Sequence, residues 1–227
     1  EDGTFTRLWR IADPDAIAKV QAALEPSELL IADGHHRYET ARVYADEIGG
    51  EGDHRYVLMC LVALQDDGLT VFPTHRLIKD TTPETQQALR ATIEEHFDIE
   101  EISTLDLRPP DGEGPLTMGF YDRRNEKAYR LTLKDQAIAD AALAEYPDAY
   151  RQLDTAVLES LILKGPLGLT EDDISHLRGL GYSRTDDEAL QLVRTSAYDF
   201  AFFLRASPVQ QVRDVAARSA LLAALPP

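Results

Sequence analysis

This sequence has almost no cysteine, no long apolar run and far fewer basic than acidic residues, 23 against 40. The 227 residues contain one cysteine, so no disulfide can form within the chain, and we expect a cytoplasmic protein. No apolar run approaches the roughly 20 residues that a membrane-spanning helix needs, so we expect no membrane association. The net charge of −17 disfavours a DNA- or RNA-binding surface, which needs clustered lysine and arginine. These absences leave a globular protein of one large or two small domains, with a small molecule as its expected partner.

The single cysteine, Cys60, lies inside the apolar run 57–62. A reactive thiolate needs an electropositive and partly exposed setting, whereas an unpaired cysteine is among the residues most often buried. We therefore expect Cys60 to be a buried core thiol.

The first part of the chain alternates short apolar runs with amphipathic segments. Asp13 and Pro14 have the residue types of a helix cap and of a first helical position. Gly49 and Gly50 are typical of a helix end. In chain order, these patterns predict a strand at 9–11, a helix from Pro14 to about 25, a strand at 29–32, a helix at 36–48 and a hairpin of strands at 55–64 and 69–72.

The second part again mixes helical and strand patterns. It predicts a helix at 83–97, a hairpin of strands at 116–121 and 127–133, a helix at 155–164 capped by Asp154, a helix at 188–195, a strand at 199–204 and a helix at 208–217. This mixture indicates an α+β fold with a mixed sheet. We expect a first domain over residues 1–80 that carries the site, and a second α+β portion over residues 81–227 packed on it.

The densest cluster of chemically useful side chains is Asp33-Gly34-His35-His36-Arg37. It follows an apolar run and opens a helix, whose first N–H groups have no partner within the helix. Gly34 permits a tight turn and a close ligand, Arg37 supplies a planar fork suited to phosphate, and both histidines add donors. Asp33 is placed to hold a metal ion or to accept a proton. The cluster predicts a phosphate-binding turn.

Two other interpretations of this cluster remain open. Asp33 can simply cap the helix, with the histidines as ordinary polar residues at its start. A transition-metal site is a further alternative, but adjacent histidines on a helix diverge by about 100°, and no third ligand stands at a diagnostic spacing. We expect no dedicated metal site in the protein, while a magnesium ion carried in with a nucleotide needs few protein carboxylates.

A second candidate cluster, Thr74-His75-Arg76, follows the predicted hairpin. If it lies near the first cluster, these three side chains can also contact phosphate or nucleotide. An ordinary loop with a surface arginine is the alternative.

Four motifs carry a resemblance to the DUF1015 family. They span nearly the whole chain in the family's order, at residues 31–41, 72–77, 153–154 and 199–205. The family's members are longer at the N-terminus, with a Pro-Pro-Tyr-Asp-type segment. The resemblance therefore implies that part of the active site, including the general base, can lie in such a segment.

The turn also resembles the ParB/sulfiredoxin superfamily, in which Gly-x-His-Arg opens a helix after a strand. Members bind nucleotides at that turn, and free serine kinases use an Asp-Gly-His-His-Arg-like version for ATP or ADP. Sulfiredoxin has a cysteine where this chain has His35, so its sulfinic-acid chemistry is not expected.

The resemblance implies ATP or ADP with Mg²⁺ as cofactor, and a phosphotransferase or hydrolase that acts on a small hydroxylated metabolite. Asp33, His36 and Arg37 would be catalytic, and Gly34 and His35 would help to bind phosphate. The alternative is a non-catalytic nucleotide-sensing or adaptor protein of the ParB type.

Overall fold

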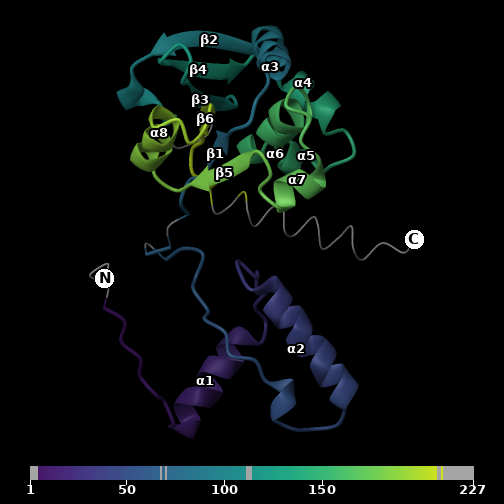
Figure 1. The fold of residues 1–227 in the computed structure, drawn as a ribbon. Helices are drawn as coiled ribbons and strands as arrows, with labels where there is room; N and C mark the ends of the chain where they lie inside the picture. Colours follow the sequence, from purple (N-terminus) through teal and green to yellow (C-terminus); the bar gives the residue numbers. More distant parts are fainter. Residues whose placement is uncertain (1–4, 67, 70, 111–113, 209–210, 212–227) are drawn as a thin grey trace. The chain divides into compact units, whose positions relative to one another are not determined.

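The computed structural model describes residues 5–66, 68–69, 71–110, 114–208 and 211 (Figure 1). The chain divides into two compact units, Glu1–Leu61 and Val62–Pro227, here called unit 1 and unit 2. The division lies at residues 61 and 62, whereas the sequence placed it at residues 80 and 81. The difference arises because the strand at 75–78 pairs within the sheet of unit 2.

Unit 1 contains two helices, α1 (Pro14–Leu24) and α2 (His35–Ile48), and a short 3-10 turn at Asp53–Arg55. Asp13 caps α1 as expected, since its carboxylate accepts a hydrogen bond from the N–H of Asp15. Gly49 ends α2, also as expected. Both helix boundaries were predictable because they depend on residues within one turn of the helix end.

The strands expected in this part of the chain are not observed. No described residue of 9–11, 29–32, 55–64 or 69–72 belongs to a strand. The apolar residues of 55–64 are not buried either, since Leu58 is 99% exposed. Cys60 is exposed too, which corrects the prediction of a buried thiol. An apolar run indicates a tendency to be buried, but it does not supply the paired strand that burial requires.

Unit 2 is built on a six-stranded sheet in the order β2-β4-β3-β6-β1-β5. Every pairing within it is antiparallel, so the prediction of a mixed sheet is corrected while the α+β class is confirmed. The strands are β1 (His75–Ile78), β2 (Phe97–Ile102), β3 (Thr117–Asp122), β4 (Lys127–Leu133), β5 (Leu180–Ser183) and β6 (Phe200–Phe203).

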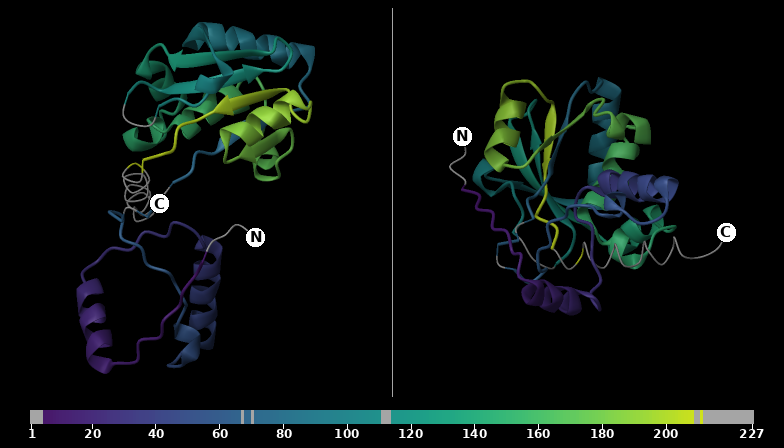
Figure 2. Two further views of the ribbon diagram at one scale, coloured as in Figure 1. Left: turned by 90° about the vertical axis from the view of Figure 1, so that its left-hand side faces the viewer. Right: turned by 90° about the horizontal axis from the view of Figure 1, so that it is seen from below.

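Helices cover both faces of this sheet, and Figure 2 shows α8 on the side opposite to the other helices of the unit. One face packs its larger core, including Met118 and Phe202, against α3, α4 and α6. The other face, including Leu77 and Phe203, packs against α8. The helices are α3 (Pro83–His96), α4 (Gln136–Ala142), α5 (Asp148–Arg151), α6 (Asp154–Leu158), α7 (Glu171–Ser175) and α8 (Asp186–Arg194).

The predictions for unit 2 were closer to the structure than those for unit 1. The hairpin of β3 and β4, helix α3 and strand β6 lie within one or two residues of their expected bounds. The expected helix at 155–164 is α6 followed by a π-helical segment, Glu159–Lys164. Its cap is Leu153, because the carboxylate of Asp154 contacts Arg205. The helix expected at 208–217 lies almost wholly outside the described residues.

Among the described residues, no helix is both long and apolar enough to cross a membrane.

Candidate functional site

The predicted phosphate-binding turn is the start of α2 in unit 1. Gly34 takes the N-cap position with φ 87°, in the left-handed region that glycine enters without strain. No side chain caps this helix. The carbonyl of Gly34 accepts the first helical hydrogen bond, from the N–H of Tyr38 at 2.9 Å. In the described part of the chain, the N–H groups of His35, His36 and Arg37 are therefore available donors at the positive end of the helix dipole.

The guanidinium of Arg37 folds back over this turn. Its Nη2 lies 3.2 Å from Oδ2 of Asp33. A Cβ atom at Gly34 would come within 2.9 Å of the same Nη2, and the residue would also be strained by its positive φ. Glycine at this position thus leaves room for the guanidinium beside the first residue of the turn. Both side chains of the ion pair are largely exposed, so the contact is weak and easily exchanged for a ligand.

Asp33 is ionised at neutral pH. The hydrogen bond from the backbone of Gly34, together with the Arg37 guanidinium, lowers the pKa of Asp33 below its ordinary value. A carboxylate with a lowered pKa suits charge stabilisation or metal binding better than proton abstraction.

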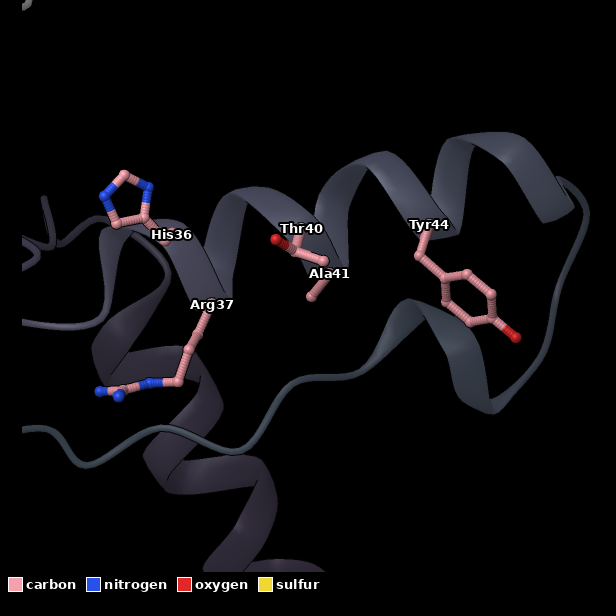
Figure 3. A pocket seen from close by; sticks show the side chains of 5 residues that line it. All are labelled: His36, Arg37, Thr40, Ala41 and Tyr44. Carbon is pink, nitrogen blue, oxygen red and sulfur yellow. The ribbon is translucent and has the colours of Figure 1, made fainter.

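A shallow hollow of about 480 Å³ runs along one face of α2 from this turn (Figure 3). His36 and Arg37 line its first part, Thr40 and Ala41 its middle and Tyr44 its far end. These positions are one turn apart, so their side chains share a face of the helix. His36 and Tyr44 are about 12 Å apart along the axis, at 1.5 Å per residue. The hollow thus combines the Arg37 guanidinium and the His36 ring at one end with the Tyr44 ring at the other.

The described residues contain no group of three or more histidine, cysteine, aspartate or glutamate side chains that could hold a metal ion. Asp33 is the one carboxylate of the turn. A magnesium ion bound mainly by nucleotide phosphates needs only one or two protein carboxylates, so this donor set fits that role and no closed metal site.

The second candidate cluster belongs to unit 2, where His75 and Arg76 begin β1. Successive residues of a strand point to opposite faces. His75 is completely buried on the face covered by α8, and its ring lies 5.0 Å from that of Phe203. Its Nδ1 accepts the N–H of Leu204 at 3.2 Å. The structure therefore turns His75 toward the interior, away from any ligand in solvent.

The other ring nitrogen of His75 meets Asp186 at the start of α8. Nε2 and Oδ1 are 2.8 Å apart, although they are not aligned as a regular hydrogen bond, and neither has another partner among the described residues. Both atoms are buried, so they are in contact with each other and not with solvent. Burial lowers the pKa of His75 despite the opposing effect of Asp186. A neutral ring with its proton on Nε2 suits both neighbours, because Nδ1 can accept the N–H of Leu204 while Nε2–H faces the carboxylate of Asp186.

Arg76 points to the opposite face of the sheet. Its guanidinium carbon lies 4.6 Å from the centre of the Tyr182 ring, and Nη1 donates to the carbonyl of Thr74. At the same end of the sheet, Arg205 forms a two-pronged contact with Asp154, at 2.6 and 3.0 Å. Asp154 and Arg205 lie in motifs that the sequence had singled out, but their pairing could not be read from residues 51 positions apart.

The comparisons with known proteins establish the family of the chain. A family described as a protein of unknown function, DUF1015, matches residues 1–156, and the chain belongs to it. No curated protein matches the chain.

Three solved structures are similar to the chain, at low identity. A conserved hypothetical protein from Pyrococcus furiosus is 15% identical, with a TM-score of 0.46 over 90% of this chain and 76% of that chain. A variant of free serine kinase in complex with ADP is 14% identical, with a TM-score of 0.45, covering 92% and 77%. Another variant in complex with AMP is 15% identical, with a TM-score of 0.43 and the same coverage. At these scores the likeness carries no functional argument.

Proposed function

We propose that the protein binds the phosphate groups of a nucleotide, ATP or ADP, at the start of α2. The observation that carries the proposal is the uncapped helix start, where the N–H groups of His35, His36 and Arg37 stand beside the Arg37 guanidinium. Backbone donors of this kind bind anions whatever the net charge of the protein. The resemblance of the turn to the ParB/sulfiredoxin superfamily leads us to propose that unit 1 is a core of that type.

The hollow along α2 gives the rest of the nucleotide a place. Tyr44 lies at the far end of the hollow and is 52% exposed. A nucleotide base can stack on an exposed tyrosine ring. The Thr40 hydroxyl lies between the two ends and can donate to or accept from a ribose. A nucleotide bound in this way would have its phosphate, sugar and base along one face of the helix.

We propose further that the protein transfers or hydrolyses the terminal phosphoryl group, with a small hydroxylated metabolite as acceptor. Arg37 and His36 would neutralise the charge that moves with the phosphoryl group, which is the main task of a protein in this chemistry. Asp33 would hold magnesium or orient the acceptor hydroxyl. Magnesium, when bound with the nucleotide, supplies further charge neutralisation.

One observation favours the alternative of a nucleotide sensor or adaptor without turnover. Asp33 is the one carboxylate of the turn, and the bonds that lower its pKa make it a poor base. Nucleotide binding without any loss of the terminal phosphate, in the presence of hydroxylated acceptors, would support the sensor over the enzyme.

The test is isothermal titration of ATP, ADP and CTP with magnesium into wild type, Arg37→Ala and Arg42→Ala. Arg42 is an exposed arginine of the same helix that does not line the hollow, so it controls for the loss of charge. We expect Arg37→Ala to weaken binding about tenfold to a hundredfold, as for loss of a charged hydrogen bond, and Arg42→Ala to have little effect. Equal weakening by both, or no binding by folded wild type, would reject the proposal.

A second pair of variants tests the direction of the nucleotide along the hollow. Tyr44→Ala should weaken ATP and ADP by about five- to a hundredfold through lost stacking, while inorganic phosphate binds as before. Tyr38→Ala removes a tyrosine of the same helix that is outside the hollow, and should leave all affinities unchanged. If Tyr44→Ala also leaves ADP binding unchanged, the base does not lie on this face.

A further inference from the structure

A second basic side chain, Arg76 in unit 2, is held in place without a matching acid among the residues that the structure describes. It lies on β1, which is an interior strand between β6 and β5. The Tyr182 ring supports its guanidinium at 4.6 Å, and the Thr74 carbonyl accepts one of its N–H groups. Burial lowers the pKa of this guanidinium below its ordinary value, although it stays charged at every physiological pH. The group is therefore a fixed and partly desolvated cation.

No carboxylate forms an ion pair with Arg76 in the described part of the chain. Glu159 is the acid whose charge acts on Arg76, but its own carboxylate lies 2.9 Å from the ammonium of Lys164. Lys164 also contacts Glu171. In a chain with a net charge of −17, an arginine that is partly buried and lacks an acidic partner is unusual, because an uncompensated charge is costly to desolvate.

Arg205 provides the contrast at the same end of the sheet. The side chains of Arg205 and Asp154 are 12% and 10% exposed, and they form the two-pronged pair described above. A guanidinium satisfied in this way has a structural role. Arg76 has the same chemical group, but among the described residues no carboxylate pairs with its fork.

We propose that Arg76, stacked on Tyr182, is a binding site for the oxyanion of a small molecule, either a phosphate or a carboxylate group. The planar fork of arginine matches both groups. The aromatic ring and the Thr74 carbonyl fix the guanidinium before the ligand arrives, so little side-chain entropy is lost on binding.

The backbone beside the site supports this assignment. The segment that begins with Glu159 is a π-helix, Glu159–Lys164, directly after α6. Such segments are rare and occur frequently at functional sites. The site lies in unit 2 and does not rest on nucleotide binding at α2, so the two proposals can fail separately.

The test is an NMR titration of the full chain with inorganic phosphate and, separately, with acetate, following the Arg76 side-chain Nε–H and the backbone amides of β1 and β5. We expect a saturable response to at least one anion, about tenfold tighter or more than the response at Arg184, an exposed arginine just beyond β5. The anion that saturates first defines the chemical class of the ligand. Arg37→Ala should leave this response unchanged.

Variants separate a binding role from a structural one. Arg76→Lys keeps the charge but loses the planar fork, and should abolish the saturable response of the β1 and β5 amides. Tyr182→Leu should weaken binding about three- to tenfold through the lost cation–π contact, and Tyr182→Phe should preserve it. No saturable response in wild type, or an unchanged response in folded Tyr182→Leu and Arg76→Lys, would overturn the proposal.

Discussion

Two consecutive side chains, His75 and Arg76, lie on opposite faces of one strand, and this alternation gives them different roles. The sequence identified both as polar residues in one motif. It could not show that His75 faces the interior beside α8, because that depends on which face of β1 the helix covers. Of these two residues, only Arg76 is therefore proposed to bind an oxyanion, while His75 contacts Phe203 of β6 and Asp186 of α8.

At this residue scale, the buried His75 predicts how stability depends on pH. Burial places its folded-state pKa below the ordinary value near 6.5, with Arg76 and Arg108 acting in the same direction against Asp186. The unfolded chain therefore binds a proton first as the pH falls. The free energy of unfolding should therefore be highest above about pH 6.5, with respect to this group, and should decrease as the pH falls below that value. Urea unfolding followed by circular dichroism between pH 5 and 8 measures this.

The matched variant is His75→Asn, whose side-chain oxygen can accept the N–H of Leu204 in place of Nδ1. It should be less stable at pH 8 but lose less of its remaining stability on acidification. If the wild type and His75→Asn have parallel profiles between pH 5 and 7, His75 is not the group responsible.

At the scale of single elements, local signals predicted most of the helices and long-range pairing decided the strands. Helix α3 was predictable because Thr82 caps it and Pro83 opens it within the sequence itself. Strand β5 was missed because its four residues depend on pairing with β1, about 100 positions earlier in the chain. The apolar run at 57–62 has a strand-like composition but has no strand partner in the described residues.

Strand β3 carries a glycine whose role is steric. A Cβ atom at Gly119 would stand 1.9 Å from the carbonyl oxygen of Leu107, which is backbone and cannot rotate away. We expect Gly119→Ala to lower the unfolding free energy of unit 2 by about 1–3 kcal/mol or more, as for an overpacked core. Thr117→Ala at the start of the same strand should cost about 1 kcal/mol or less. Equal effects of both changes in urea unfolding would refute the close packing of Leu107 on β3.

At the scale of the whole molecule, the two units differ in how much apolar surface they bury. Unit 2 has two clusters of buried side chains, one on each face of its sheet. In unit 1, neither α1 nor α2 contains a buried residue. The charge and composition of the chain gave no indication of this difference, because they describe the sum of the two units.

The single tryptophan gives a direct measure of this difference. Trp9 lies in unit 1 and is 75% exposed. We expect its fluorescence maximum to be that of an indole in water, with quenching by acrylamide close to that of a free tryptophan derivative. The signal should also change little across the urea transition that unfolds the sheet of unit 2. A blue-shifted and protected Trp9 would show that unit 1 buries its apolar residues.

The candidate site was predicted from the sequence to the extent that it is local. Gly34 and the following helix start lie where the motif placed them, and their geometry depends on five consecutive residues. The hollow that ends at Tyr44 was not predicted, because it depends on which face of α2 is left open. The strand expected before the turn is not observed. The proposal of a phosphate site therefore rests on the start of α2 alone.

The most direct measurement of the central claim is an amide NMR titration of the full chain with ADP and magnesium. We expect the backbone N–H signals of His35, His36 and Arg37 to shift first and furthest and to saturate with one dissociation constant. In Arg37→Ala, the signals of residues 35 and 36 should shift much less at the same concentration. Saturable ADP binding that leaves these three amides unshifted in the wild type would contradict the claim and place the nucleotide elsewhere on the protein.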